Sequence, residues 1–221
     1  MNTLRRRLLI STTTGAACAS LALPALASSR RALAAMTDGP FYPPSRWRER
    51  GPLAGDWDAD LTRVERQGQA QTARGEHLGL QLRLVDSKDR LVDNAQIEIW
   101  QCDALAQYRH PQVELQGGAF DPGFQGFGAA KSGPNGVLTM RTIKPVAYPG
   151  RTPHIHIKVR HASFGEFTSQ LFIAGDPGNA RDFLWRAVPE AQRSGHDMRL
   201  MPAEGSAGLR WTADHGVVVP A

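Results

Sequence analysis

The stretch HLGLQLRLVD, residues 77–86, alternates apolar and polar side chains along most of its length. Leucine occupies every second position from Leu78 to Leu84, so an extended chain would carry all of these leucines on one face. The polar run SKDR follows at residues 87–90 and is typical of a turn. The pattern predicts a β-strand with one face in a hydrophobic core.

Other short segments of the chain have the same strand-like pattern. They are AQIEIWQCD at residues 95–103, VLTMRTI at 137–143, HIHIKV at 154–159 and FTSQLFIAGD at 167–176. Turn-forming residues separate them, and only residues 180–192 show helical spacing, which Pro189 interrupts. Short strands between frequent turns predict an all-β fold, namely a β-sandwich of mixed or antiparallel strands with long loops. A length of 221 residues favours a single domain.

Residues 36–60 precede most of the predicted strands and have no hydrophobic period. They are rich in Gly, Pro and Asp, and long irregular segments of this kind are usually either functional or disordered. Three aromatic residues, Phe41, Tyr42 and Trp47, favour a packed segment. We therefore expect an N-terminal extended arm that lies over the core.

Residues 1–27 have the three-part layout of an export signal. Arg5 to Arg7 form a basic start, an apolar run follows, and Ala25 to Ala27 resemble a cleavage site. Arginines followed by leucines are similar to the twin-arginine signal, which predicts a periplasmic or secreted protein. Cleavage could fall as late as residue 35, so residues 36–221 are the expected mature domain, with no stable membrane span.

Charge and cysteine content exclude several classes of protein. Without the arginines of the signal, the chain carries 23 basic and 21 acidic residues. This balance, with no basic stripe interleaved with aromatic residues, argues against a nucleic-acid partner. Cys18 lies in the signal and Cys102 stands alone, so no disulfide can form within the processed chain.

His154 and His156 stand one residue apart in HIHIKV. On a strand they project from the same face about 7 Å apart, so two imidazoles can bind one metal ion. The spacing alone leaves a solvated or hydrogen-bonded pair equally open. The other histidines are scattered, and we expect them at the surface: His77, His110, His161, His196 and His215.

Two of the three tyrosines in the chain lie in settings that suit the same site. Tyr148 precedes His154 by six residues, and Tyr108 follows a predicted strand. Phenolate oxygen is a hard anionic ligand, and two phenolates with two imidazoles would neutralise much of the charge of ferric iron. The alternative for each tyrosine is a half-buried ring with its hydroxyl on a backbone group.

Ordered blocks of sequence run from the arm to the last predicted strand. They are TDGPFY at 37–42, IEIWQCDA at 97–104, YRH at 108–110, RTIKP at 141–145, YPGR at 148–151, HIH at 154–156 and TSQLF at 168–172. In this order the blocks resemble the intradiol ring-cleavage dioxygenases of the catechol and protocatechuate type. The resemblance covers most of residues 36–177 and implies an intradiol dioxygenase-like β-sandwich at residues 36–221.

The resemblance implies a site for ferric iron, Fe(3+), held by Tyr108, Tyr148, His154 and His156. It also implies that a small aromatic diol binds through both oxygens, and that Tyr148 then leaves the metal and takes up a proton. Ring cleavage with O2 between the two hydroxylated carbons would give a muconate-type diacid, with both oxygen atoms incorporated.

Further residues acquire expected roles from the same resemblance. Arg151 corresponds to the family's active-site arginine, and a fixed cation there could stabilise charge on the ring carbon that oxygen attacks. Gln170 corresponds to a glutamine behind the metal site that orients a ligand. The resemblance places Gly39, Pro40 and Tyr42, together with Arg151, in the substrate pocket.

The sequence departs from the family in ways that bear on substrate and assembly. Only two residues separate Tyr148 from Arg151, where protocatechuate enzymes usually carry a longer insertion, and no helical dimerisation domain like that of catechol enzymes is recognised. The ring substituent and a homo-oligomeric assembly therefore stay open.

Two rival hypotheses remain. An exported β-sandwich module could capture metal or a catechol without turnover, although simple metal storage would not need Arg151. A zinc or copper hydrolase built on the two histidines would lack a matching carboxylate base and would leave the tyrosines without a role.

Overall fold

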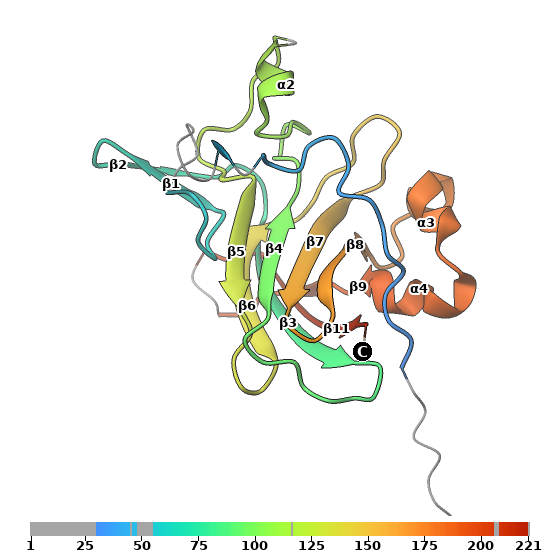
Figure 1. Cartoon of the computed structure of the whole chain (residues 1–221). Helices are drawn as coiled ribbons and strands as arrows, with labels where there is room; N and C mark the ends of the chain where they lie inside the picture. The colour runs from blue at the N-terminus through green and yellow to red at the C-terminus, as the bar shows by residue number, and fades with distance from the viewer. Residues whose placement is uncertain (1–29, 45, 48–54, 116, 206–207, 221) are drawn as a thin grey trace, which may run out of the picture.

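The computed structural model describes residues 30–44, 46–47, 55–115, 117–205 and 208–220. The expected export signal at residues 1–27 lies outside this part of the chain. Two β-sheets form the two layers of a sandwich, with short helices at one side (Figure 1). The predicted all-β sandwich is therefore confirmed. No helix within the described residues is long and apolar enough to cross a membrane.

The first sheet contains four strands with the HLGLQLRLVD strand inside it. Their order is β10 (Met201–Pro202), β11 (Trp211–Val219), β3 (His77–Asp86) and β6 (Val137–Ile143). β3 pairs antiparallel with β6 and parallel with β11, so the sheet is mixed.

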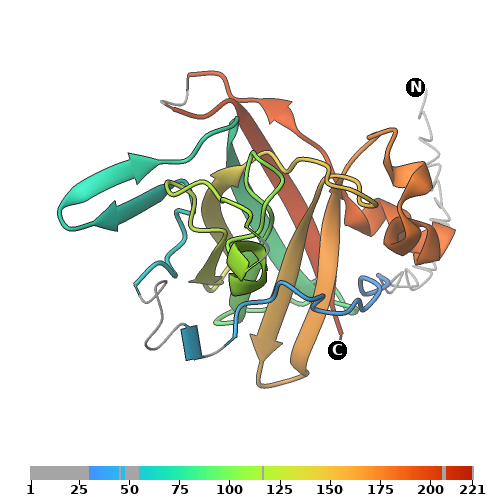
Figure 2. The ribbon, with the colours of Figure 1, turned by 90° about the horizontal axis from the view of Figure 1, so that it is seen from above.

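The second sheet contains five strands and carries the two adjacent histidines. Their order is β5 (Phe127–Lys131), β4 (Gln96–Trp100), β7 (His154–His161), β8 (Gly165–Ile173) and β9 (Asp197–Met198). All neighbours are antiparallel except β8 and β9. A separate hairpin of β1 (Arg63–Arg66) and β2 (Gln69–Thr72) projects from the body of the molecule (Figures 1 and 2).

The core lies between the two sheets and follows the predicted alternation. The leucines at alternate positions of β3 are at most 1% exposed. They belong to one buried cluster with Ile155, Ile157 and Val159 of β7. Complete burial of such a side chain stabilises the fold by about 1.5–3 kcal/mol. Because Ile155 and Ile157 point inward, the histidines between them point to the outer face of the second sheet.

The N-terminal arm covers that outer face. The backbone N–H of Met36 donates to the Thr168 carbonyl at 2.9 Å, which places the arm beside β8. Farther along, Phe41, Tyr42 and Trp47 pack against a second apolar cluster, which contains Trp100 and other buried residues. The prediction of a packed arm is confirmed for the described part of residues 36–60 (Figure 2).

The helices that lie wholly within the described residues are α2 (Pro111–Leu115), η1 (Asn179–Arg181), α3 (Phe183–Ala187) and α4 (Glu190–His196). The prediction for residues 180–192 is confirmed, because α3 ends before Pro189 and α4 begins after it. No helical pattern in the sequence predicted α2.

The prediction that the remaining histidines lie at the surface is wrong for three of them: His110, His196 and His215 are buried. His196 accepts a hydrogen bond from the Ala34 N–H at 3.1 Å and donates to the Gln170 carbonyl at 2.9 Å. The ring therefore joins the arm to β8. This role could not be predicted from the spacing of histidines in the sequence. Burial lowers the pKa of His196 and keeps the ring neutral.

Candidate metal centre

Strand β7 delivers His154 and His156 to the same spot on the outer face. The register places His156 opposite Trp100 of β4 on one side and opposite Gln170 of β8 on the other. The Trp100 ring stacks on the His156 ring with centroids 4.6 Å apart. Both histidines are buried because neighbouring loops and the arm cover this part of the sheet.

Tyr108 reaches the histidines from the loop after β4. Asp103 organises that loop, since one of its oxygens accepts hydrogen bonds from the Leu105 N–H at 2.8 Å and the Gln107 N–H at 2.9 Å. Phe41 of the arm stacks on the Tyr108 ring with centroids 4.5 Å apart. The loop that carries Tyr108 and the Phe41 ring of the arm therefore together hold the phenol in place.

A tight turn places Tyr148 next to Arg151. Pro149 and Gly150 occupy its centre, and Gly150 has a φ of 83°, as a type II turn requires. The Arg151 N–H donates to the Tyr148 carbonyl at 2.9 Å, so both side chains leave the same end of the turn. The Tyr148 ring lies 5.5 Å from the His154 ring and 5.7 Å from the Tyr108 ring.

Three donor atoms meet within hydrogen-bonding distance of one another. The Nε2 atoms of His154 and His156 are 3.2 Å apart, and the Tyr108 hydroxyl lies 3.4 Å from the first and 3.2 Å from the second. The His154 Nδ1–H donates to the Thr152 carbonyl at 2.7 Å, so the lone pair of its Nε2 points into the cluster.

Burial shifts the pKa of all four groups toward the neutral form. Desolvation and then the charge of Arg151 lower the pKa of His154 to about 4. Desolvation, followed by the neighbouring His154, lowers the pKa of His156. Desolvation also raises the pKa of Tyr148 and raises that of Tyr108 well above its ordinary value. The site thus presents neutral imidazoles beside phenols that a strongly charged cation would deprotonate.

This donor set fits a hard trivalent cation. Two imidazole lone pairs 3.2 Å apart repel each other unless a proton or a metal ion lies between them. Within the described part of the chain, no three His, Cys, Asp or Glu side chains are arranged to hold a metal ion. Beside the histidine pair, Tyr108 and Tyr148 offer phenol oxygens, which are hard donors.

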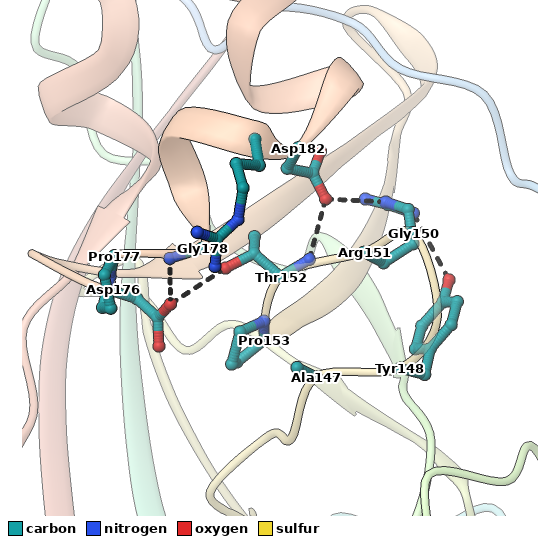
Figure 3. Close-up of a pocket in the computed structure, with 11 residues that line it drawn as sticks. Ala147, Tyr148, Gly150, Arg151, Thr152, Pro153, Asp176, Pro177, Gly178 and Asp182 are labelled. Carbon is teal, nitrogen blue, oxygen red and sulfur yellow. Dashed lines mark hydrogen bonds and ion pairs between the residues drawn. The ribbon is translucent and has the colours of Figure 1, made fainter.

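Arg151 is buried beside the tyrosine, with 9% of its side chain exposed. Its Nε–H donates to Asp182 at 2.8 Å, its NH2 group donates to Gln170 at 2.5 Å, and its NH1 group lies 3.4 Å from the Tyr148 hydroxyl. Gln170 was expected to orient a metal ligand, but its side chain contacts the arginine. A hollow of about 430 Å³ opens next to Tyr148 and Arg151 (Figure 3).

The three expected pocket residues of the arm occupy different settings. Gly39 has a φ of 73°, and a Cβ atom there would lie 3.6 Å from the His156 ring. Pro40 is exposed. The Tyr42 hydroxyl donates to Glu98 at 2.6 Å and accepts from Arg160 at 2.9 Å, so it fastens the arm to the sheet. Of these residues, Gly39 directly borders a candidate ligand.

Charged residues farther along the histidine face also hold the arm. Lys158, with 3% of its side chain exposed, forms ion pairs with Asp38 of the arm at 2.6 Å and with Glu166 at 3.1 Å. Its ammonium lies 3.9 Å from the centre of the Tyr42 ring. Because Asp38 and Tyr42 flank Gly39, these contacts fix the part of the arm that lies over His156.

Replacing Lys158 with methionine is expected to lower the free energy of unfolding by about 1–2 kcal/mol. The loss should be smaller than for a fully buried pair, because Asp38 and Glu166 are 38% and 50% exposed. Denaturant unfolding measures the effect, and Lys88→Met, at an exposed position, is the control. Equal stabilities of the two variants would contradict a role for Lys158 in holding the arm.

Comparison with known proteins identifies relatives of this chain. The family model described as Dioxygenase matches residues 50–212. The protocatechuate 3,4-dioxygenase beta chain of Burkholderia cepacia is 34% identical over 152 residues, which are 65% of this chain and 61% of that protein. The chain thus spans about three fifths of the length of that relative.

Solved structures share the fold. An intradiol ring-cleavage dioxygenase from Tetranychus urticae superposes with a TM-score of 0.63 and 18% identity, covering 86% of this chain and 95% of that one. The dioxygenase domain of a carbohydrate-binding fusion protein from Streptomyces sp. SirexAA-E has a TM-score of 0.59 and 24% identity, covering 86% and 99%. On the sequence matches and this shared fold, the chain belongs to the intradiol ring-cleavage dioxygenase family.

Proposed function

We propose that this protein is an iron(III)-dependent intradiol dioxygenase. In this proposal it cleaves a catecholic ring between the two hydroxylated carbons with O2 and releases a muconate-type diacid. The observation that carries the proposal is the meeting of the His154, His156 and Tyr108 donor atoms within 3.4 Å, with Tyr148 and Arg151 at the edge of the same cluster. The bound iron would supply the chemistry that activates the catechol toward O2.

The two tyrosines differ in their freedom to move. Tyr108 is 5% exposed and is held under the Phe41 ring, whereas Tyr148 is half-buried beside the hollow. Of the two tyrosines that would hold the iron, Tyr148 has the room to move when a diol binds, and its oxygen could then take up a proton from the substrate. The Arg151 guanidinium lies beside that oxygen and would face a diol bound there.

Oxygen uptake tests the proposal. The iron-loaded protein should consume O2 with at least one of catechol, protocatechuate and hydroxyquinol, and mass spectrometry should show a product heavier than the substrate by two oxygen atoms. Binding of a catechol without uptake across a broad panel would favour the alternative, an exported metal- or catechol-binding module.

We also propose that residues 1–27 direct export, in line with their basic start and apolar run. Expression in a bacterium with an active twin-arginine system should give processed protein outside the cytoplasm. Replacing Arg5 and Arg6 with lysines should retain the full-length chain in the cytoplasm. Equal export of both forms would exclude the twin-arginine route.

Replacing Tyr148 with phenylalanine is expected to weaken the visible charge-transfer band of the iron-loaded protein and to slow diol binding. A phenyl ring keeps the packing but removes the oxygen that would bind the metal. Tyr42→Phe is the matched control, because the Tyr42 hydroxyl bonds to Glu98 and Arg160 and should leave the band unchanged. An unaltered spectrum in Tyr148→Phe would remove Tyr148 from the ligand set.

A further inference from the structure

Asp182 is a buried carboxylate next to Arg151. It lies between η1 and α3, and its side chain is 0% exposed. Its Oδ2 accepts hydrogen bonds from Arg151 Nε at 2.8 Å and from the Thr152 N–H at 3.0 Å (Figure 3). Its Oδ1 accepts from the N–H groups of Leu184 and Trp185 at 2.9 and 3.0 Å.

These contacts divide the carboxylate into two functional halves. Oδ1 caps the first turn of α3, which is a structural task. Oδ2 binds Arg151 and the backbone next to it. Burial alone would favour the protonated acid, but the hydrogen bonds from Trp185, Thr152 and Arg151 lower the pKa of Asp182, so the group is charged.

Arg151 depends on this contact for its orientation. The guanidinium is planar, so fixed bonds from Nε to Asp182 and from NH2 to Gln170 determine the direction of the remaining NH1 group. That group lies 3.4 Å from the Tyr148 hydroxyl. The Phe183 ring, whose centre is 5.4 Å from the guanidinium carbon, packs beside the same group.

We infer that Asp182 is a positioning residue that acts through Arg151: it holds the guanidinium so that NH1 faces Tyr148 and the substrate oxygen that would replace it. The inference rests on the proposed function of the site. Asp182 lies at the hollow beside Tyr148, but the hydrogen bonds of its carboxylate go to Arg151 and to backbone N–H groups rather than to a candidate metal ligand. Because Asp182 is the N-cap of α3 and also binds Arg151, the position of this helix affects the orientation of the arginine.

Asp182→Asn tests the contacts of Oδ2 separately from those of Oδ1. An asparagine oxygen can keep the cap of α3, while its NH2 group would face the donors Arg151 Nε–H and Thr152 N–H. The ratio kcat/KM is expected to fall about 10- to 100-fold, the range found when residues that orient active-site groups are lost. The loss should lie mainly in kcat, because Arg151 acts on charge that develops during reaction. Asp182→Ser, which also retains a cap, should give the same result if the asparagine variant folds poorly.

A double-mutant cycle distinguishes positioning through Arg151 from a general effect on folding. In an Arg151→Met background, Asp182→Asn should change kcat/KM less than about twofold, because its target is already absent. Asp86→Asn is the control for loss of an Asp–Arg contact away from the site: the buried Asp86 accepts from the exposed Arg90 Nε at 2.6 Å and caps the turn after β3, and this variant should keep wild-type kcat/KM. Equal losses in the wild-type and Arg151→Met backgrounds, or no loss in either, would overturn the inference.

A readout independent of turnover keeps this test separate from the proposed function. In NMR spectra, the Arg151 Nε–H of the wild-type protein should exchange slowly with solvent, and Asp182→Asn should shift this signal and speed its exchange. If the protein lacks dioxygenase activity but the signal responds, the proposed function fails while the positioning contact stands. An unchanged signal would overturn the positioning role itself.

Discussion

Replacing His154 with alanine is expected to abolish iron binding and ring cleavage together. The His154 Nε2 atom is one of the three donor atoms of the cluster, 3.2 Å from His156 Nε2 and 3.4 Å from the Tyr108 hydroxyl. Alanine would remove one of four proposed ligands and leave a hole in a buried site. The affinity for iron should fall by more than about 100-fold, beyond the 10- to 100-fold typical of residues that only orient a ligand. Metal analysis, visible absorbance and oxygen uptake measure the three consequences.

His161→Ala is the matched control for this experiment. His161 ends the same strand, is partly exposed and bonds to the Ser163 hydroxyl at 2.8 Å. Its loss should leave iron content and colour unchanged. A His154→Ala protein that still carries one iron per chain and remains coloured would show that the metal lies elsewhere.

The sandwich was predictable because its determinants are local. Alternating leucines from Leu78 to Leu84 specify which face of β3 is buried, and the same rule applied to β7 sends His154 and His156 together to the opposite face. Tyr108 and Tyr148 required more than spacing, since they reach the histidines from two separate loops. Only the ordered motifs connected them to the same site.

The supporting contacts were not predictable from local pattern. Asp182 lies 31 residues beyond Arg151 in the sequence, and Lys158 forms an ion pair with Asp38, which is 120 residues away in the sequence. Lys158 and Arg160 alternate with apolar residues on β7, a pattern that ordinarily indicates a solvent-exposed face. The arm crosses the sheet and covers Lys158 fully and Arg160 in part. The path of an irregular segment cannot be read from a periodic pattern in the sequence. An N-cap aspartate before FLWRA was the one available sign of Asp182.

The presence of Arg151 favours an enzyme over a metal-binding module, because a protein that only stores iron needs no fixed cation at the edge of the ligand cluster. Its guanidinium lies beside the Tyr148 hydroxyl, and Asp182 and Gln170 fix the plane of the guanidinium. A preorganised charge of this kind acts most strongly where the reaction develops negative charge.

Arg151→Met is expected to lower kcat by about 10²- to 10³-fold, the cost of removing one preorganised group that stabilises charge in a buried site. Iron content and the visible band should persist, because the side chain contacts the Tyr148 hydroxyl without being a ligand. Arg151→Lys should recover only part of the loss, since an ammonium cannot bond Asp182 and Gln170 with the geometry of the guanidinium fork. Steady-state kinetics measure kcat, and the melting temperature of each variant reports any destabilisation from leaving Asp182 without its ion pair. Full activity in Arg151→Met would assign the arginine to stability alone, and loss of iron would place it in the metal site.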